Sequence, residues 1–223
     1  MTGPLTLALD AATVRGSVAV VQGTRVLAQR EVGMRSEGAE RLLPAVAAAL
    51  AEAGVGVAEL RRIVCGAGPG SFTGLRIAAS IAKGLATARP VPLYGVSSLA
   101  LLVAGAEPAP APGTYLAVLD ALRGDVFVAA VSVRMDVAVS PLEAPVLVSR
   151  SEVQDLAARL GALRAGPAEP LAWTPHARGV ARMGAWLATV PPVDLASWEP
   201  VYGRLAEAQV KWERAHGRSL PAT

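Results

Sequence analysis

The sequence predicts an α/β fold of two lobes, each built on a mixed sheet flanked by helices. Three observations lead to this fold class. Residues 5–96 alternate between short apolar runs and helical stretches, a Pro/Ala-rich segment interrupts the chain at 107–113, and the pattern of the first strands then recurs. A chain of 223 residues is long enough to bury a core in one large domain or in two smaller lobes.

The first lobe is expected to hold three consecutive strands followed by helix, strand, helix and strand. Gly16 and Gly23 supply turns between the first strands, and Pro90 and Pro92 end the second helix. The strands are expected at 5–9, 17–21, 26–32, 62–66 and 91–96, and the helices at 40–53 and 73–88. This order resembles that of the ribonuclease H-like folds of actin and the sugar kinases, which is an analogy of fold alone.

The second lobe is expected to begin like the first. An apolar strand ends at Asp10 and is followed by a turn and a returning strand, and the same arrangement recurs at Asp120. A duplicated lobe explains a single recurrence better than a repeat array does. Further helices are expected at 151–160, with Ser151 as N-cap, at 175–187 and at 204–216. We expect a first lobe at 1–106, a smaller second lobe at 107–202, and a C-terminal helix at about 203–217 that packs on the first lobe.

Composition argues against several classes of function. The net charge is only +3, aromatic residues make up 4% of the chain, and no Arg/Lys cluster is interleaved with them, so a nucleic-acid-binding platform is not expected. Cys65 is the single cysteine and lies in an apolar run, which predicts a buried thiol. The N-terminus does not resemble a secretory signal, and no apolar run approaches the roughly 20 residues of a membrane span. We therefore expect a cytoplasmic protein that does not contact a membrane.

A glycine-rich loop at 66–74 lies between a predicted strand and a predicted helix. Free backbone N–H groups and the helix dipole at such a place can bind a phosphate. The loop lacks the Lys-Ser/Thr ending of a P-loop and the glycine spacing of a dinucleotide site. A phosphate site and a structural turn capped by Ser71 or Thr73 both stay open.

Few residues are suited to catalysis. Asp10 and Asp120 end equivalent strands, where carboxylates could hold metal and phosphate, but they could equally be ordinary turn residues. The two histidines, His176 and His216, are far apart in the sequence, so neither a metal site nor a nucleophilic triad is supported. Ser97 and Ser98 are expected to cap the helix that follows them.

The two helices of the first lobe are apolar on more than one face. Ala78, Ala82 and Ala86 form a stripe of small residues at a spacing of four that would let another helix approach closely. Alanine is also simply a good helix former, which is the alternative explanation. The residues expected at a partner interface are Leu43, Ala47, Leu50, Ala51, Leu75, Ala78, Ala79, Ala82, Lys83 and Ala86.

The chain resembles the TsaB (YeaZ) family. The segment 68–76, GPGSFTGLR, carries the resemblance most specifically. Further similar segments are 5–10, 40–44 (ERLLP), 82–86 (AKGLA), 95–99 (GVSSL), Asp120 with 123–127, 199–202 (EPVY) and 210–213 (VKWE). Ala11 and Ala12 stand where hydroxyl-bearing residues follow the first aspartate in the family, and Ala67 stands where an arginine is common.

The resemblance implies an actin-like, non-catalytic subunit of the bacterial complex that makes threonylcarbamoyladenosine in tRNA. Its implied partners are a TsaD-type catalytic subunit, paired through the first-lobe helices, and a TsaE-type ATPase. The apolar surface of these helices should favour a homodimer when the chain is alone, and any tRNA contact is expected through the complex. The complex modifies N6 of adenosine 37 in tRNAs that read codons beginning with A.

The residues give no reason to expect a catalytic group or a metal in this chain. No cofactor is expected either, because the resemblance implies that ATP belongs to the partner subunits. Weak nucleotide binding is left open at Asp10, Gly68, Gly70, Ser71 and Asp120. The rival hypothesis is an actin-like phosphotransferase or nucleotide-binding enzyme that acts alone through these residues. A protease is the third hypothesis, and no catalytic constellation in the sequence supports it.

Overall fold

The computed structural model describes residues 3–34, 41–121 and 123–202, which form two mixed sheets flanked by helices. The first sheet has the strand order β3–β2–β1–β4–β5. Its strands are β1 (Leu5–Asp10), β2 (Arg15–Gln22), β3 (Arg25–Gly33), β4 (Arg62–Gly66) and β5 (Leu93–Val96). β1 is antiparallel to β2 and parallel to β4. The predicted meander of three strands followed by parallel strands is thereby confirmed.

The second sheet has the order β10–β6–β7–β8, and β9 also pairs with β7. Its strands are β6 (Gly113–Asp120), β7 (Asp125–Val133), β8 (Val139–Pro141), β9 (Val146–Ser149) and β10 (Leu163–Ala165). β6 is antiparallel to β7 and parallel to β10. The hairpin β6–β7 therefore repeats the hairpin β1–β2, with Asp120 and Asp10 at the ends of equivalent strands.

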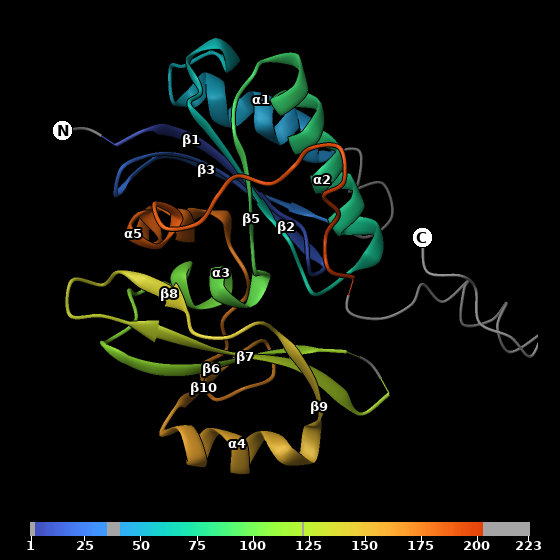
Figure 1. The fold of residues 1–223 in the computed structure, drawn as a ribbon, viewed down its shortest axis with the longest axis vertical. Helices are drawn as coiled ribbons and strands as arrows, with labels where there is room; N and C mark the ends of the chain where they lie inside the picture. The colour runs from blue at the N-terminus through green and yellow to red at the C-terminus, as the bar shows by residue number, and fades with distance from the viewer. Residues whose placement is uncertain (1–2, 35–40, 122, 203–223) are drawn as a thin grey trace, which may run out of the picture.

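The elements stack in layers along the long axis of the molecule (Figure 1). The helices α1 (Leu42–Glu52) and α2 (Phe72–Ala88) share a core with one face of the first sheet. On the other face, α3 (Ser98–Ala104), the 3-10 helix η4 (Ala177–Arg182) and α5 (Gly184–Leu187) share one core with both sheets. The helix α4 (Val153–Leu160) covers the outer face of the second sheet. Every residue of α3 is buried, because the helix lies between the two sheets.

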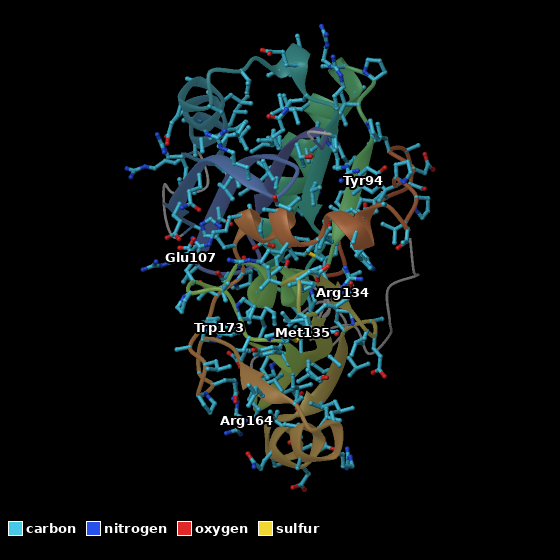
Figure 2. The ribbon with its side chains drawn as sticks, turned by 90° about the vertical axis from the view of Figure 1, so that its left-hand side faces the viewer. Tyr94, Glu107, Arg134, Met135, Arg164 and Trp173 are labelled. Atoms are coloured by element: carbon cyan, nitrogen blue, oxygen red, sulfur yellow. The ribbon has the colours of Figure 1, made fainter. Side chains whose placement is uncertain are left out.

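The chain returns to the first sheet after completing the second. Figure 2 shows Arg164 of β10 in the lower layer and Tyr94 of β5 in the upper one. The backbone N–H of Val193 donates to Leu93 O (2.8 Å), and that of Val201 donates to Ala67 O (2.8 Å). Residues 193–202, which we call the return strap, therefore run along the edge strand β5 and reach the glycine loop. The lobe boundary at 106/107 stays a prediction, and the helix expected at 204–216 lies outside the described residues.

Two of the predicted second-lobe helices differ from the structure. α4 begins at Val153 after a single 3-10 turn, η3 (Arg150–Glu152), and its N-cap is Glu152, so the assignment of Ser151 as N-cap was wrong. The stretch 175–187 forms η4 and the short α5 in place of one helix. Two glycines, Gly179 and Gly184, weaken a continuous helix there. None of the helices in the described ranges is long and apolar enough to cross a membrane.

Candidate functional site

The glycine loop connects β4 to α2, as the sequence predicts, and begins next to Asp10. Because β1 and β4 are parallel neighbours, their carboxyl ends meet at the same edge of the sheet. Ser71 is the N-cap of α2, and its Oγ accepts a hydrogen bond from the Gly74 N–H (3.3 Å). The capping role expected for Ser71 is confirmed.

The loop packs tightly against the turn that follows β1. A Cβ added at Gly66 would overlap Asp10 Oδ2, one at Gly70 would lie 2.7 Å from Ala12 Cβ, and one at Gly74 would overlap the Ala11 carbonyl oxygen. Only glycine fits at these three positions, because atoms of residues 10–12 already occupy the space that a side chain would need. The loop lies directly against the chain's own turn.

Several N–H groups of the loop that could bind a phosphate already have partners within the chain. The Ser71 N–H donates to Ala12 O (2.7 Å), and the Ala67 N–H donates to Val96 O (2.7 Å). The Gly68 N–H donates to Ser98 Oγ (3.2 Å). An anion would have to displace these hydrogen bonds in order to bind here. The geometry therefore favours the structural turn among the alternatives that the sequence left open.

Asp10 is a fully buried hydrogen-bond acceptor at the centre of this packing. Its Oδ2 accepts from Ser98 Oγ (2.6 Å), and its Oδ1 accepts from the Ala12 N–H (3.1 Å). Burial raises the pKa of the Asp10 carboxyl, and the hydrogen bond from Ser98 opposes that shift. Burial likewise raises the pKa of the neighbouring Cys65 thiol, which makes it unreactive.

Ser98 is the residue whose role the sequence did not reveal. Its hydroxyl bridges Asp10 and the Gly68 N–H, so it joins β1, the loop and α3. Ser97 is the N-cap residue of α3, as expected, although its side chain makes no capping bond. The expectation that Ser98 also caps α3 was wrong, because its hydroxyl bonds Asp10 and Gly68. The GVSSL segment marks the position, but the partner of Ser98 comes from a distant strand.

Asp120 lies in a different environment from Asp10. It is exposed at the end of β6, and Asp10 is buried at the end of β1. The turn after Asp120 contains Arg123 and Gly124, both with positive φ. Among the described residues, no group of three or more His, Cys, Asp or Glu side chains is arranged to hold a metal ion. The structure therefore does not place Asp10 and Asp120 in matching sites.

The expected interface residues of α2 are mostly buried within the chain. Leu75, Ala78 and Ala82 have no exposed surface, and only traces of Ala79 and Ala86 are exposed. They pack on the sheet, while Ile77, Ile81 and Leu85 are partly buried beside them. Small side chains allow α2 to approach the sheet closely, which is why the alanine stripe faces inward. Leu50, Leu75, Ala78, Ala79, Ala82 and Ala86 are therefore buried within the chain in this conformation, and their assignment to a partner interface stays a prediction.

The remaining predicted interface residues are accessible to different degrees. Leu43 is 54% exposed, and Ala47 and Ala51 follow it at a spacing of four on the exposed side of α1. α2 lies beside α1 on the same face of the sheet and adds the half-exposed Ile77 and Ile81 (Figure 1). We call these five residues the α1–α2 surface. Lys83 is half-buried, and its Nζ donates to Trp198 O in the return strap (3.0 Å).

The return strap holds the start of α2 from the other side. The Trp198 ring packs against Gly95, where an added Cβ would lie 3.0 Å from the indole nitrogen. Tyr202 contacts the Phe72 ring, with 4.7 Å between the ring centroids. The EPVY segment at 199–202 marked this region in the sequence, but nothing in it predicted the contact with α2.

Comparisons with known proteins identify relatives of this chain. The family model described as TsaD, tRNA N6-adenosine threonylcarbamoyltransferase, matches residues 35–158. The tRNA threonylcarbamoyladenosine biosynthesis protein TsaB of Escherichia coli is 39% identical over 121 residues, which are 54% of this chain and 52% of that protein. The match thus spans about half the length of this curated relative.

Two solved structures from Pseudomonas aeruginosa share the fold. YeaZ is 27% identical with a TM-score of 0.73, and the match covers 89% of this chain and 99% of YeaZ. A protein described as similar to the peptidase YeaZ is 26% identical with a TM-score of 0.74, covering 90% of this chain and all of that one. These matches support the fold over nearly the whole chain.

Proposed function

Because the chain belongs to the TsaB (YeaZ) family, we propose that it is an accessory subunit in the synthesis of threonylcarbamoyladenosine in tRNA. In this proposal it pairs with a TsaD-type catalytic subunit, activates it, and works with a TsaE-type ATPase. The target is adenosine 37 of tRNAs that read codons beginning with A. When the chain is alone, it forms a homodimer through α1 and α2, the helices that pair with the catalytic subunit.

The observation that carries the proposal is the α1–α2 surface. Leu43, Ala47 and Ala51 form an exposed apolar row along α1, although a surface helix normally turns polar residues to solvent. An exposed apolar row on a helix is typical of a protein–protein interface. The α1–α2 surface also lies on the outer face of the first sheet, where a second chain can reach it (Figure 1).

The packing of the glycine loop supports a non-catalytic role. Asp10 is buried, and the N–H groups of Ala67, Gly68 and Ser71 are hydrogen-bonded within the chain, so several of the groups that phosphoryl transfer would need are already engaged. Ser98 is fully buried between Asp10 and Gly68, which argues against a protease nucleophile at this carboxylate. ATP hydrolysis belongs to the partner subunits in this proposal.

Substitutions on the exposed side of α1 test the pairing. The double variant Leu43→Glu/Ala47→Glu should reduce co-purification with the TsaD-type subunit at least about tenfold, because two charges would be buried in an apolar contact. The same variant should lower threonylcarbamoyladenosine formation by the reconstituted complex, measured by mass spectrometry of tRNA nucleosides. Its thermal unfolding should match that of the parent, since both side chains are exposed.

The matched control places the same changes on another exposed helix face. Ala158 and Leu160 are exposed on α4 in the second lobe. The variant Ala158→Glu/Leu160→Glu should pair and support modification as the parent does. Unimpaired pairing of Leu43→Glu/Ala47→Glu would overturn the interface assignment. Tight Mg-ATP binding with turnover by the isolated chain, measured by calorimetry, would favour the rival phosphotransferase.

A further inference from the structure

A groove of about 570 Å³ opens between the lobes, at the opposite end of β1 from Asp10. One wall comes from the amino-terminal ends of β1 and β4, with Thr6 and Arg62. The other walls come from the β7–β8 hairpin at 134–138 and from η4 and α5. Its volume lies within the range of small-molecule sites, roughly 300–1,000 Å³. The groove is therefore distinct from the glycine loop.

The charged side chains that line the groove are predominantly positive. Arg62, Arg134 and Arg182 line it together with a single carboxylate, that of Asp136. Arg134 pairs with Asp136 (2.8 Å), and Arg182 donates to the carbonyl oxygens of Ala104 and Ala106. Three arginines and one aspartate leave two positive charges in excess. Such a lining attracts an anion.

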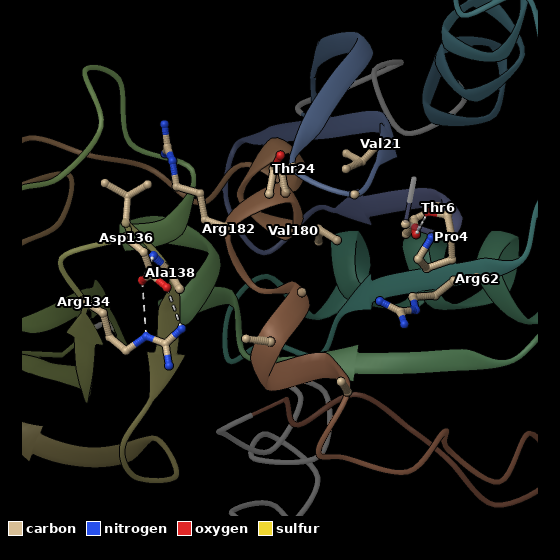
Figure 3. A pocket seen from close by; sticks show the side chains of 17 residues that line it. Pro4, Thr6, Val21, Thr24, Arg62, Arg134, Asp136, Ala138, Val180 and Arg182 are labelled. Carbon is tan, nitrogen blue, oxygen red and sulfur yellow. Dashed lines mark hydrogen bonds and ion pairs between the residues drawn. The ribbon is translucent and has the colours of Figure 1, made fainter. Parts of the chain in front are cut away.

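Arg62 is oriented without a carboxylate partner among the described residues. Its guanidinium lies over the ring of Tyr94, 5.2 Å from the centroid. This stacking holds the charge in place and leaves its N–H donors available to a ligand. Figure 3 shows Arg62 on one side of α5 and the Arg134–Asp136 pair on the other. The two ends of the groove therefore each carry a guanidinium group.

Small residues keep the space between these ends open. Gly184, Ala185 and Ala188 line the groove and are exposed, so α5 places no large side chain there. Val21 and Val180 add apolar surface that a carbon skeleton can contact. The middle of the groove thus suits the uncharged part of a ligand.

Backbone strain in the β7–β8 hairpin is a second, independent sign of a site. Val137 lines the groove and has a φ of 56°, which a β-branched residue rarely adopts. The turn is held by hydrogen bonds from Val137 N to Arg134 O (2.9 Å) and from Ala138 N to Asp136 Oδ1 (3.1 Å). Strain of this kind gathers at ligand sites. Here it fixes Arg134 at the end of the groove.

We propose that this groove binds a small organic anion with a phosphate or carboxylate group at each end, held by Arg62 at one end and by Arg134 at the other. At the second end, Arg134 exchanges its partner Asp136 for the anionic group of the ligand. The apolar side chains of Val21 and Val180 contact the carbon skeleton between the two anionic groups. All the residues that line the groove come from this chain, and none of them belongs to the α1–α2 surface. The proposal is therefore independent of the role in tRNA modification. A failure of either proposal leaves the other intact.

Calorimetric titration of the isolated full chain with fructose 1,6-bisphosphate tests the two-ended arrangement. We expect saturable binding with a dissociation constant of about 0.1 mM or tighter. Inorganic phosphate, which can reach only one end, should bind at least about tenfold more weakly. Arg62→Gln and Arg134→Gln should each weaken bisphosphate binding about tenfold or more, because each removes a charge-assisted hydrogen bond.

Arg61→Gln is the matched control, since Arg61 neighbours Arg62 and its guanidinium bonds backbone carbonyls at residues 58–60. It should bind the bisphosphate as the parent does. Three outcomes would overturn the proposal. They are the absence of saturable bisphosphate binding, equal binding of inorganic phosphate, and an equal loss of binding in Arg61→Gln.

Discussion

Gly66→Ala tests whether the glycine loop is closed by its contact with Asp10. The added Cβ would overlap Asp10 Oδ2 and lie 2.9 Å from its Cγ. Gly66 does not have a positive φ, so the backbone itself accepts alanine. The substitution therefore isolates the steric contact with the carboxylate.

The expected loss of stability follows from what Asp10 must give up. Moving the carboxylate away breaks the 2.6 Å hydrogen bond from Ser98, a bond to a charged group worth about 1.5–3 kcal/mol. Overpacking of the added methyl group adds about 1–3 kcal/mol to the loss of stability. Alanine also lowers the conformational entropy of the unfolded chain, which offsets about 0.4–1 kcal/mol of that loss. We expect Gly66→Ala to lower the free energy of unfolding by about 2–5 kcal/mol, measured by urea denaturation.

A double-mutant cycle with Asp10→Ala makes the reasoning refutable. Removing the carboxylate also removes the overlap, so Gly66→Ala should cost less than about 1 kcal/mol in that background, which corresponds to a strong coupling energy. Additive effects of the two substitutions would refute the closed-loop interpretation. A stability of the single variant within about 0.5 kcal/mol of the parent would refute it equally.

Other predictions concern pH, a buried ion pair and backbone strain. Burial, with a smaller effect of Arg178, lowers the pKa of His176 from 6.5 to about 4. The unfolded chain therefore binds this proton first, and stability falls as the pH drops from 7 towards 4. The free energy of unfolding lost between pH 7 and pH 5 should be about 2 kcal/mol larger in the parent than in His176→Asn. The raised pKa of Asp10 makes stability change with pH in the opposite direction, and it does so in both proteins, so the comparison cancels its effect. Equal slopes in urea denaturation would contradict the assignment. Glu169→Ala should cost about 3 kcal/mol in chemical denaturation, because this buried carboxylate pairs with two arginines at 3.0 and 3.6 Å; a cost below about 1 kcal/mol would mean that the pairs are weak. Val137→Gly should raise the stability by about 1 kcal/mol, since glycine adopts a φ of 56° without strain; a lower melting temperature would contradict this.

Local sequence patterns predicted most of the first lobe. β4 was predicted at 62–66 and is observed at Arg62–Gly66, and α2 was predicted at 73–88 and is observed at Phe72–Ala88. Both are bounded by glycine or proline, and such signals act within a few residues along the chain. The second lobe was predicted less well after the β6–β7 hairpin, because β8, β9 and β10 were not predicted. A 3-10 turn also precedes α4, and the stretch 175–187 does not form one helix.

The candidate site was only partly predictable, because its key contacts join distant segments. The glycine loop and Asp10 could be located in the sequence, but the bond between Asp10 and Ser98 joins β1 to the start of α3. The groove is assembled from five separate stretches of chain. No periodicity or spacing brings such residues together before the sheets have formed.

The sequence by itself determined where the strands of the first lobe, α2 and its glycine-rich start lie, because alternation and turn residues act locally. It could not determine which face of α2 is buried, since alanines line one face and Ile77 and Ile81 lie on another. Only the tertiary structure decided this, by pressing Gly74 against the Ala11 carbonyl and bringing α2 close to the sheet. At that separation the sheet accommodates the small alanine side chains and leaves the isoleucines at the edge of the contact.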